Sequence, residues 1–185
     1  IFNFKNEKSL LSPTNPYSAS KAAADLIAQS YFKSYKMPLV LVRSNNLYGP
    51  YQHVEKIIPA TISAVNFGKK LSIHGKGLTT RHFLHIDDLC EAIFILFKKF
   101  KPGQIYNIAG KSSIKIIELI KMISQIKGVN FKEISNFVQD RPFNDKNYKI
   151  NCEKIKKLGW KEKKNFLTEI KKITLKNQVF KTFNK

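Results

Sequence analysis

The chain has 185 residues, of which 43% are hydrophobic, and this is enough for a domain with a substantial core. No apolar run approaches the ~20 residues that a membrane-spanning helix needs, so we expect no membrane partner. The formal net charge of +20 would suit nucleic acid. However, the lysines are spread along the whole chain and no nucleic-acid-binding motif accompanies them, so nucleic acid is not the main partner that we expect.

The remaining composition gives little sign of metals or disulfides. Cys90 and Cys152 form no pattern and favour a reducing, cytoplasmic setting. The four histidines lack metal-ligand spacing, so no metal site is predicted. The chain starts with Ile1 and resembles neither a signal peptide nor a transit peptide. We therefore expect a chain that is entered in the middle of a fold.

Sequence patterns predict helices and strands that alternate along the chain. Helices are expected over residues 17–35, 57–66, 86–99, 113–127, 152–158 and 166–180, with Ser113 as the cap of the fourth. Strands are expected over residues 38–42, 71–73, 81–85, 104–108 and 134–138, and loops over 43–54 and 140–147. This alternation is typical of an α/β fold. The glycine-rich turn that follows the first strand of a dinucleotide-binding fold is not in the sequence.

The first predicted helix carries a tyrosine and a lysine one turn apart. Tyr17 and Lys21 are four residues apart and so share a helix face. A phenol, with an ordinary pKa near ~10, is a poor base at neutral pH, but a neighbouring ammonium group stabilises the phenolate. Such a pair can take a proton from a sugar hydroxyl while hydride leaves for a nicotinamide. In a lysine-rich chain the same spacing also occurs in ordinary amphipathic helices, so the pair needs support from other motifs.

Arginine is rare in this lysine-rich sequence. Among 33 Lys and Arg residues, only Arg43, Arg81 and Arg141 are arginines. The planar, forked guanidinium group binds phosphate or carboxylate in a way that lysine cannot. We therefore expect these three side chains to make forked contacts, with ordinary ion pairs as the alternative.

Six further motifs follow the Tyr-Lys pair. They are VRSNNLYGPYQ at 42–52, EKIIP at 55–59, HGKGLTTR at 74–81, YNIAG at 106–110, DRPFND at 140–145 and LGW at 158–160. Taken in order, they resemble the extended short-chain dehydrogenase/reductase family, and within it the nucleotide-sugar 4,6-dehydratases that act on dTDP-glucose or UDP-glucose. The resemblance implies the C-terminal part of a Rossmann-type α/β enzyme. Residues 1–50 would hold the last Rossmann elements. Residues 51–185 would mainly form a small α/β substrate-binding domain, with some return to the Rossmann sheet.

The resemblance also implies NAD as the cofactor, a nucleotide sugar as the substrate and a homodimer. Tyr17 would be the base at the sugar C4 hydroxyl, Lys21 would hold the nicotinamide ribose, and Leu47 would also contact the cofactor. Arg81 would clamp the pyrophosphate and Arg141 would serve the ribose-phosphate end of the nucleotide. The full set of implied substrate contacts is Asn46, Glu55, Lys56, Leu71, Ile73, Arg81 and Arg141.

The sequence departs from the family in three places. Relatives carry a Thr-Asp-Glu triad just before the segment that matches residues 1–3, where the Asp would protonate the leaving C6 hydroxyl and the Glu would remove the C5 proton. This triad is not in the sequence, so we expect the chain alone to be inactive. Residues 141–145 read RPFND where bacterial dTDP-glucose enzymes usually read RPGHD, which is closer to UDP-rhamnose-forming enzymes and leaves the base preference open. Ser113 stands where some relatives place a substrate-contacting Asn.

Three alternatives remain open. A nucleotide-sugar 4-epimerase would use the same Tyr-Lys pair without dehydration. The chain could also be a non-catalytic remnant that binds sugar nucleotides, or a basic nucleic-acid binder. Structural roles are expected for Asp87 as a helix cap, Asn107 as a strand-end turn and Trp160 in the core.

Overall fold

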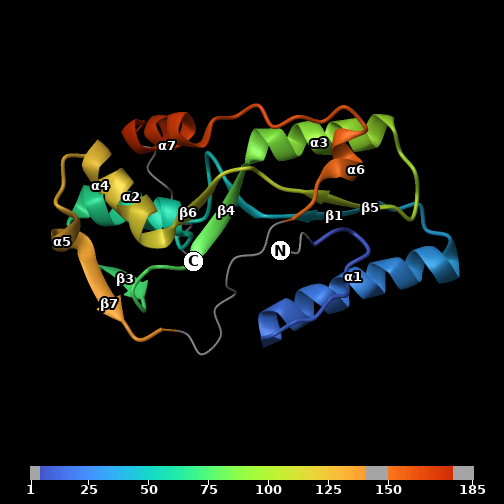
Figure 1. The fold of residues 1–185 in the computed structure, drawn as a ribbon, viewed down its shortest axis with the longest axis horizontal. Helices are drawn as coiled ribbons and strands as arrows, with labels where there is room; N and C mark the ends of the chain where they lie inside the picture. Colours follow the sequence, from blue (N-terminus) through green and yellow to red (C-terminus); the bar gives the residue numbers. More distant parts are fainter. Residues whose placement is uncertain (1–4, 141–149, 177–185) are drawn as a thin grey trace.

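The computed structural model describes residues 5–140 and 150–176, and these form an α/β fold (Figure 1). The helices are α1 (Pro16–Tyr35), α2 (Ile57–Phe67), α3 (Ile86–Lys98), α4 (Ile116–Ile126), α5 (Phe131–Ile134), α6 (Glu153–Lys156) and α7 (Phe166–Leu175). The strands are β1 (Leu41–Ser44), β2 (Asn46–Tyr48), β3 (Leu71–His74), β4 (Thr80–His85), β5 (Ile105–Ile108), β6 (Ser113–Lys115) and β7 (Ser135–Val138). None of the described helices is long and apolar enough to cross a membrane.

Within the described residues, the strands pair into three small sheets. Strands β1 and β5 run parallel, with Leu41 opposite Ile105, and they lie between α1 on one side and α3 on the other (Figure 1). Strand β4 pairs with β2 in parallel and with β6 in antiparallel orientation. Strands β3 and β7 form a parallel pair at the opposite end of the molecule (Figure 1). Strand β4 therefore runs between the two ends.

Two hydrophobic cores hold these elements. The first packs α2, α4 and α7 against β3 and includes Ile62, Ile73, Leu119, Ile123 and Ile170. The second packs α3 and α6 against β5 and includes Ala92, Leu96, Ile108, Ile155 and Trp160. Each core is apolar and its fully buried side chains have left water, which is the main source of stability.

Helix α1 is fixed by its first turn rather than by burial. The Asn15 side chain accepts a hydrogen bond from the Ser18 amide at 2.9 Å, and the Ser18 hydroxyl lies 3.2 Å from the Asn15 amide. This reciprocal capping box, followed by Pro16, is a strong helix start. None of the 20 residues of α1 is buried, and Leu26 and Ile27 are more than half exposed. The capping signal and helical periodicity, not a core contact, thus define this helix.

Most of the predicted elements are confirmed, with small shifts at their ends. The helices expected over 17–35, 57–66 and 86–99 correspond to α1, α2 and α3. The strands expected over 71–73, 81–85, 104–108 and 134–138 correspond to β3, β4, β5 and β7. The short helix expected over 152–158 is α6, and the helix expected over 166–180 corresponds to α7. Residues 177–180 of that helix, and residues 141–147 of the expected loop over 140–147, lie outside the described residues.

Two predictions were wrong about strands. The strand expected over 38–42 begins only at Leu41, and the loop expected over 43–54 contains β2. Ser113 does not cap a helix, because Ser113–Lys115 form β6 against β4, and α4 starts at Ile116. In both places hydrogen bonding to β4, a distant segment, overrides the local pattern.

Candidate functional site

Tyr17 and Lys21 lie in the first two turns of α1, on one face of the helix. Both side chains are exposed, and Tyr17 is 74% exposed. The capping box of Asn15 and Ser18 fixes the turn that carries Tyr17. A ligand can therefore reach the phenol and the ammonium group without any rearrangement of the helix.

Arg43 ties α1 to β1 through contacts within the chain. Its Nε donates to Asp25 Oδ2 at 2.7 Å, its Nη2 to Asp25 Oδ1 at 3.1 Å, and its Nη1 to the Glu7 carbonyl at 3.1 Å. The guanidinium group lowers the pKa of Asp25 below its ordinary value. The forked contact expected for Arg43 is present, but its partner is a carboxylate of the same chain.

Asn46 and Arg81 lie on neighbouring strands. Asn46 is exposed on β2, and its Nδ2 donates to the His82 carbonyl of β4 at 3.1 Å. Asn46 is opposite Phe83 in the register, two residues from Arg81, which is half-buried. Leu47 packs against the second core, and its carbonyl accepts from Gln52 Nε2 at 2.6 Å. The structure thus brings Asn46, Leu47 and Arg81 into one three-stranded sheet.

The remaining implied substrate residues lie elsewhere. Glu55 and Lys56 are exposed just before α2; the Glu55 backbone amide donates to His53 Nδ1 at 3.4 Å, and the Glu55 carboxylate lies 3.8 Å from the same nitrogen. Leu71 and Ile73 belong to β3, in a different sheet from Asn46 and Arg81. Ile73 is 1% exposed in the first core, so both its side chain and its backbone are buried in the described structure.

Arg141 lies outside the described residues. The preceding residue, Asp140, lies beside the turn after β3, where a Cβ atom added to Gly75 would be 2.7 Å from Asp140 Oδ2. Gly75 also has a φ of +58°, a conformation that favours glycine. This close approach places the start of the DRPFND motif next to the HGKGLTTR motif.

A pocket that sequence reasoning missed opens at the carboxyl ends of β1 and β5. Its volume is about 830 Å³, and its lining includes Asn45, His82, Lys111, Trp160 and Glu162. Asn45 Oδ1 is buried and has no hydrogen-bond donor among the described residues. Glu162 accepts from the Lys111 amide at 2.9 Å, and burial raises the pKa of its carboxyl. The carboxyl ends of parallel strands are where open α/β sheets bind ligands, and this general rule is the signal that could have located the pocket.

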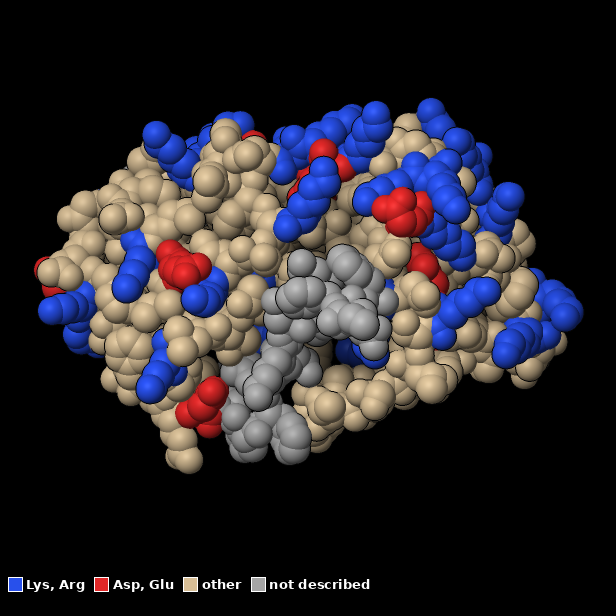
Figure 2. All heavy atoms as spheres, viewed as in Figure 1, with Lys and Arg blue, Asp and Glu red and all other residues tan. Residues whose placement is uncertain are grey.

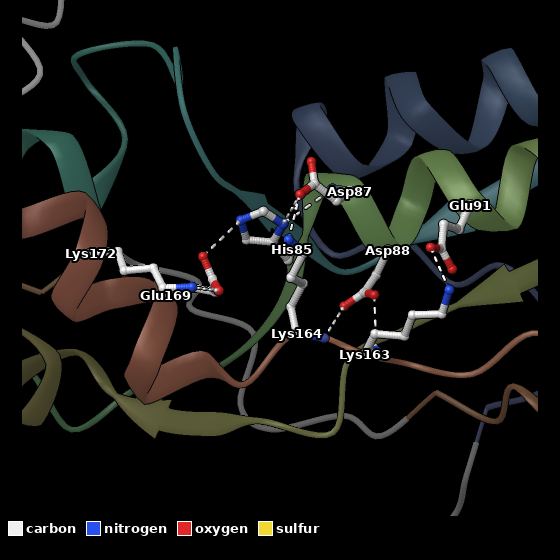
Figure 3. Close-up of polar contacts among 8 residues, drawn as sticks. All are labelled: His85, Asp87, Asp88, Glu91, Lys163, Lys164, Glu169 and Lys172. Carbon is white, nitrogen blue, oxygen red and sulfur yellow. Dashed lines mark hydrogen bonds and ion pairs between the residues drawn. The ribbon is translucent and has the colours of Figure 1, made fainter. Parts of the chain in front are cut away.

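The junction of β4 and α3 holds a polar cluster (Figure 3). Asp87 is not the cap of α3: the cap is His85, whose Nδ1 accepts from the Asp87 amide at 3.2 Å. Asp88 is 1% exposed and instead accepts from the amides of Lys163 and Lys164, at 3.0 and 3.1 Å. His85 rather than Asp87 is the cap because α3 starts directly after β4. The side chain of His85, the last residue of β4, therefore reaches the free backbone amide of Asp87.

The other two structural predictions have different outcomes. Trp160 is 2% exposed and its Nε1 donates to the Asp88 carbonyl at 2.9 Å, which confirms a core position. Asn107 does not form a turn, because it lies inside β5 and opposite Arg43. Its amide donates to Glu7 Oε1 at 3.0 Å, so its polar groups are used within the fold.

The surface charges and possible metal ligands add little to this site. On the face seen in Figure 2, Lys and Arg side chains are scattered over most of the elements, with acidic residues among them. Among the residues that the structure describes, no three His, Cys, Asp or Glu side chains gather as metal ligands would. The candidate site therefore consists of the exposed Tyr17–Lys21 pair, the Asn46–Arg81 sheet and the pocket, whose lining residues Asn45 and His82 adjoin that sheet.

Comparison with known proteins gives a consistent result. The family model described as GDP-mannose 4,6 dehydratase matches residues 3–173. The chain is 46% identical over 172 residues to the dTDP-D-glucose 4,6-dehydratase of Homo sapiens, covering 90% of this chain and 49% of that protein. It is 40% identical over 167 residues to a trifunctional UDP-glucose 4,6-dehydratase of Arabidopsis thaliana, covering 90% of this chain and 25% of that protein.

Solved structures match as well. The dTDP-glucose 4,6-dehydratase of Streptomyces venezuelae, crystallised with NAD, has a TM-score of 0.88 and 32% identity, covering 93% of this chain and 53% of that chain. The UDP-glucuronic acid 4-epimerase of Bacillus cereus has a TM-score of 0.83 and 26% identity, covering 91% of this chain and 54% of that chain. The chain thus spans about half the length of the human relative and of both crystallised enzymes.

Proposed function

The chain belongs to the GDP-mannose 4,6-dehydratase family, and we propose that it forms the C-terminal, substrate-binding portion of an NAD-dependent nucleotide-sugar 4,6-dehydratase. The observation that carries this proposal is the exposed Tyr17–Lys21 pair on a chain that is 46% identical to the human dTDP-D-glucose 4,6-dehydratase. The complete enzyme would convert dTDP-glucose or UDP-glucose to the 4-keto-6-deoxy sugar nucleotide.

The Tyr17–Lys21 pair supplies the proton chemistry at C4. Tyr17, in its phenolate form, takes the proton of the C4 hydroxyl, and the Lys21 ammonium group stabilises that phenolate. When bound, NAD supplies a hydride acceptor for C4 oxidation and returns the same hydride at C6. The C4 ketone makes the C5 proton acidic enough for water to be eliminated across C5 and C6.

The exposure of the pair supports NAD as the cofactor. The Lys21 ammonium group has three N–H donors, which suit the two hydroxyls of a nicotinamide ribose. Leu47, in the middle of β2, would add an apolar contact. Strand β2 follows the carboxyl end of β1, and the carboxyl ends of parallel strands are the usual ligand side of a Rossmann-type sheet.

The substrate contacts divide between the sugar and the diphosphate. Asn46, one strand away from Arg81, would hydrogen-bond the substrate, and the Arg81 fork would bind the pyrophosphate. Glu55 and Lys56 would line the sugar-nucleotide pocket from the turn before α2. The strand that holds Leu71 and Ile73 would pack near the base, and Arg141 would serve the ribose-phosphate end.

We place the boundary between Rossmann and substrate-binding parts near residue 50, with a later return to the Rossmann sheet. The pairing of β5 with β1 supports this return, because residues 105–108 lie beside residues 41–44. By analogy with the family, the complete enzyme would be a homodimer of the cytoplasm.

A nucleotide-sugar 4-epimerase is the second candidate, and the likeness to the Bacillus cereus epimerase favours it. An epimerase would use Tyr17 and Lys21 in the same way but would release a C4 epimer. The identity is lower than with the dehydratases, 26% against 32% for the two crystallised enzymes. The dehydratase is therefore the main proposal.

The test is an assay of a longer protein that contains this chain and the segment preceding residue 1. The protein is incubated with NAD and either dTDP-glucose or UDP-glucose, and the product is identified by mass spectrometry and NMR. We expect loss of one water from one of the two substrates and a ketone at C4. A C4 epimer of unchanged mass, or no consumption of either substrate, would contradict the proposal.

A further inference from the structure

His85 lies where β4 passes into α3, beside Asp87 of α3 and Glu169 of α7 (Figure 3), and it also contacts Tyr48 of β2. Its side chain is 3% exposed. Its Nδ1 accepts from the Asp87 amide at 3.2 Å, and its Nε2 lies 4.0 Å from Glu169 Oε2 of α7. The Tyr48 ring of β2 meets the imidazole edge-on, with centroids 5.0 Å apart and an interplanar angle of 86°. One buried imidazole therefore contacts β2, α3 and α7.

Strand β2 depends on this side-chain support. It has three residues, and among the described strands it pairs only with β4. Such a short edge strand has little stability from backbone pairing alone. Tyr48 is 3% exposed and is enclosed by His85, Phe83 and Phe166. The packing of Tyr48 therefore adds to the pairing with β4 in holding β2 in place.

The hydrogen bonds of His85 define its protonation state. Nδ1 accepts a hydrogen bond, so it carries no proton, and the proton of the neutral ring is on Nε2, toward Glu169. Burial lowers the pKa of His85, and Lys164 lowers it further, while Asp87, Glu169 and Asp88 raise it. Asp87 Oδ2 lies 3.6 Å from Nδ1 and also pairs with Lys164 at 2.8 Å. Glu169 pairs with Lys172 at 2.9 Å through Oε1, the oxygen that does not face His85, and Asp88 accepts from two backbone amides.

We propose that His85 is a positioning residue that holds β2, and with it Asn46, in the geometry that contacts the nucleotide sugar. Asn46 is two residues from Tyr48, so the two side chains lie on the same face of β2. A change in the packing of Tyr48 moves Asn46 away from the His82 carbonyl that its amide contacts. The part of this proposal that concerns the sugar rests on the proposed function, and the part that concerns β2 does not.

The contacts of His85 make the position of β2 sensitive to acid. Protonation of His85 places a hydrogen on Nδ1, which removes the acceptor for the Asp87 amide and places a charge in a buried site. Because burial disfavours this charge, protonation occurs below the ordinary histidine pKa of about 6.5. A protonated Nδ1 donates to the Asp87 carboxylate, 3.6 Å away, instead of accepting from the Asp87 amide. We expect this change to shift the ring beside Tyr48, so that β2 loosens as the pH falls.

Two substitutions separate the ring from the hydrogen bond. His85→Asn keeps an acceptor for the Asp87 amide, and Asn is a good helix cap, but the ring beside Tyr48 is lost. His85→Phe keeps a ring beside Tyr48 but cannot accept a hydrogen bond or titrate. Glu169→Gln keeps the shape opposite Nε2 and removes one carboxylate that favours the imidazolium. His74→Asn removes an exposed histidine of β3 and is the matched control.

The measurement is amide hydrogen exchange of residues 46–48, corrected for the intrinsic pH dependence of exchange. It runs from about pH 7.5 to about pH 4.5, a range that extends well below the ordinary histidine pKa. Wild-type protection of β2 should fall about tenfold on acidification, the effect of one lost buried hydrogen bond. His85→Phe should keep β2 protected throughout, His85→Asn should show low protection throughout, and His74→Asn should match the wild type. Glu169→Gln should move the fall to lower pH.

The opposite pattern, in which His85→Asn protects β2 and His85→Phe does not, would show that His85 is only a helix cap and would overturn the proposal. Constant wild-type protection over the whole range would also overturn it. Binding of dTDP and UDP to the same proteins tests the link to Asn46: His85→Asn should bind about tenfold more weakly than His85→Phe. Equal affinities would overturn that link. If the wild type binds neither nucleotide, the proposed function fails, while the exchange data still decide the role of His85 in β2.

Discussion

The Arg43 guanidinium binds the Asp25 carboxylate through two hydrogen bonds, and this pair joins the helix that carries Tyr17 and Lys21 to strand β1. The side chains are 21% and 12% exposed, so the pair is partly withdrawn from water. Since no residue of α1 is buried, few other contacts can set the orientation of this helix within the described chain. The position of Tyr17 and Lys21 relative to β1 therefore depends on the contact between Arg43 and Asp25.

Replacement of Arg43 by Lys should destabilise the protein by about 1–3 kcal/mol, because a single ammonium group cannot reproduce the forked contact. Asp25→Asn should cost a similar amount, and the double variant should cost less than the sum. Urea unfolding gives the three free energies of unfolding. Strictly additive losses would mean that the two side chains do not interact.

The same pair gives a pH dependence with a definite sign. Hydrogen bonding to Arg43 lowers the pKa of Asp25 below its ordinary value of 3.8. The folded state thus holds the proton less tightly than the unfolded state, so the stabilisation is present above that value and is lost as the pH falls through the lower folded-state pKa. In Arg43→Lys this acid-dependent loss should become smaller, which acid unfolding curves can measure.

Asp88 should be a stability determinant although it belongs to no ligand site. Its carboxylate accepts from two backbone amides of the segment that leads into α7, Lys163 and Lys164. Asp88→Ala leaves both amides without this acceptor and should cost about 1–3 kcal/mol. Asp88→Asn, which keeps one acceptor oxygen, should cost less. Equal urea midpoints for the two variants would contradict this account.

The two cysteines should differ sharply in reactivity. Cys90 is exposed on α3, whereas Cys152 is buried, and burial raises the pKa of its thiol to about 11. Because the thiolate is the reactive form, a disulfide reagent at about pH 8 should label Cys90 quickly and Cys152 only after unfolding. Cys90→Ser should remove the fast phase and Cys152→Ser should leave it. Two fast phases in the wild type would show that Cys152 is accessible.

The proposed catalytic pair predicts a loss of turnover without loss of stability. Tyr17→Phe removes the proton acceptor at an exposed site and should lower kcat about 10²–10⁴-fold in the longer enzyme. Lys21→Met should lower kcat as well, because the phenolate loses its neighbouring charge. Tyr31→Phe and Lys33→Met, on the same helix, are the matched controls. Wild-type turnover in Tyr17→Phe would exclude Tyr17 as the base.

The sequence was sufficient for elements whose signal is local. Helix α1 follows from Asn15-Pro16 and a long helical period, and Trp160 follows from its apolar size. Strand β2 was missed because it has three residues in a stretch rich in Asn, Gly and Pro, and only β4 makes it a strand. Ser113 was assigned as a cap because β6 is equally short and depends on the same neighbour.

The candidate site also has a part that local sequence predicts and a part that it does not. Spacing alone predicted that Tyr17 and Lys21 share a face, and α1 confirms the helix that this requires. Nothing local indicates that His85 contacts β2, α3 and α7, since a lone histidine between Leu84 and Ile86 reads as an ordinary strand end. Its neighbours Tyr48 and Glu169 are far away in the sequence, and only the folded chain brings them together.

The most direct test of the central claim follows a single hydrogen atom. The longer enzyme is supplied with NAD and with dTDP-glucose or UDP-glucose that carries deuterium at C4, and the product is examined by NMR. We predict a 4-keto-6-deoxy sugar nucleotide with the deuterium at C6, because the hydride removed from C4 is returned there. Deuterium retained at C4 of an epimerised sugar would contradict dehydration and assign the chain to a 4-epimerase.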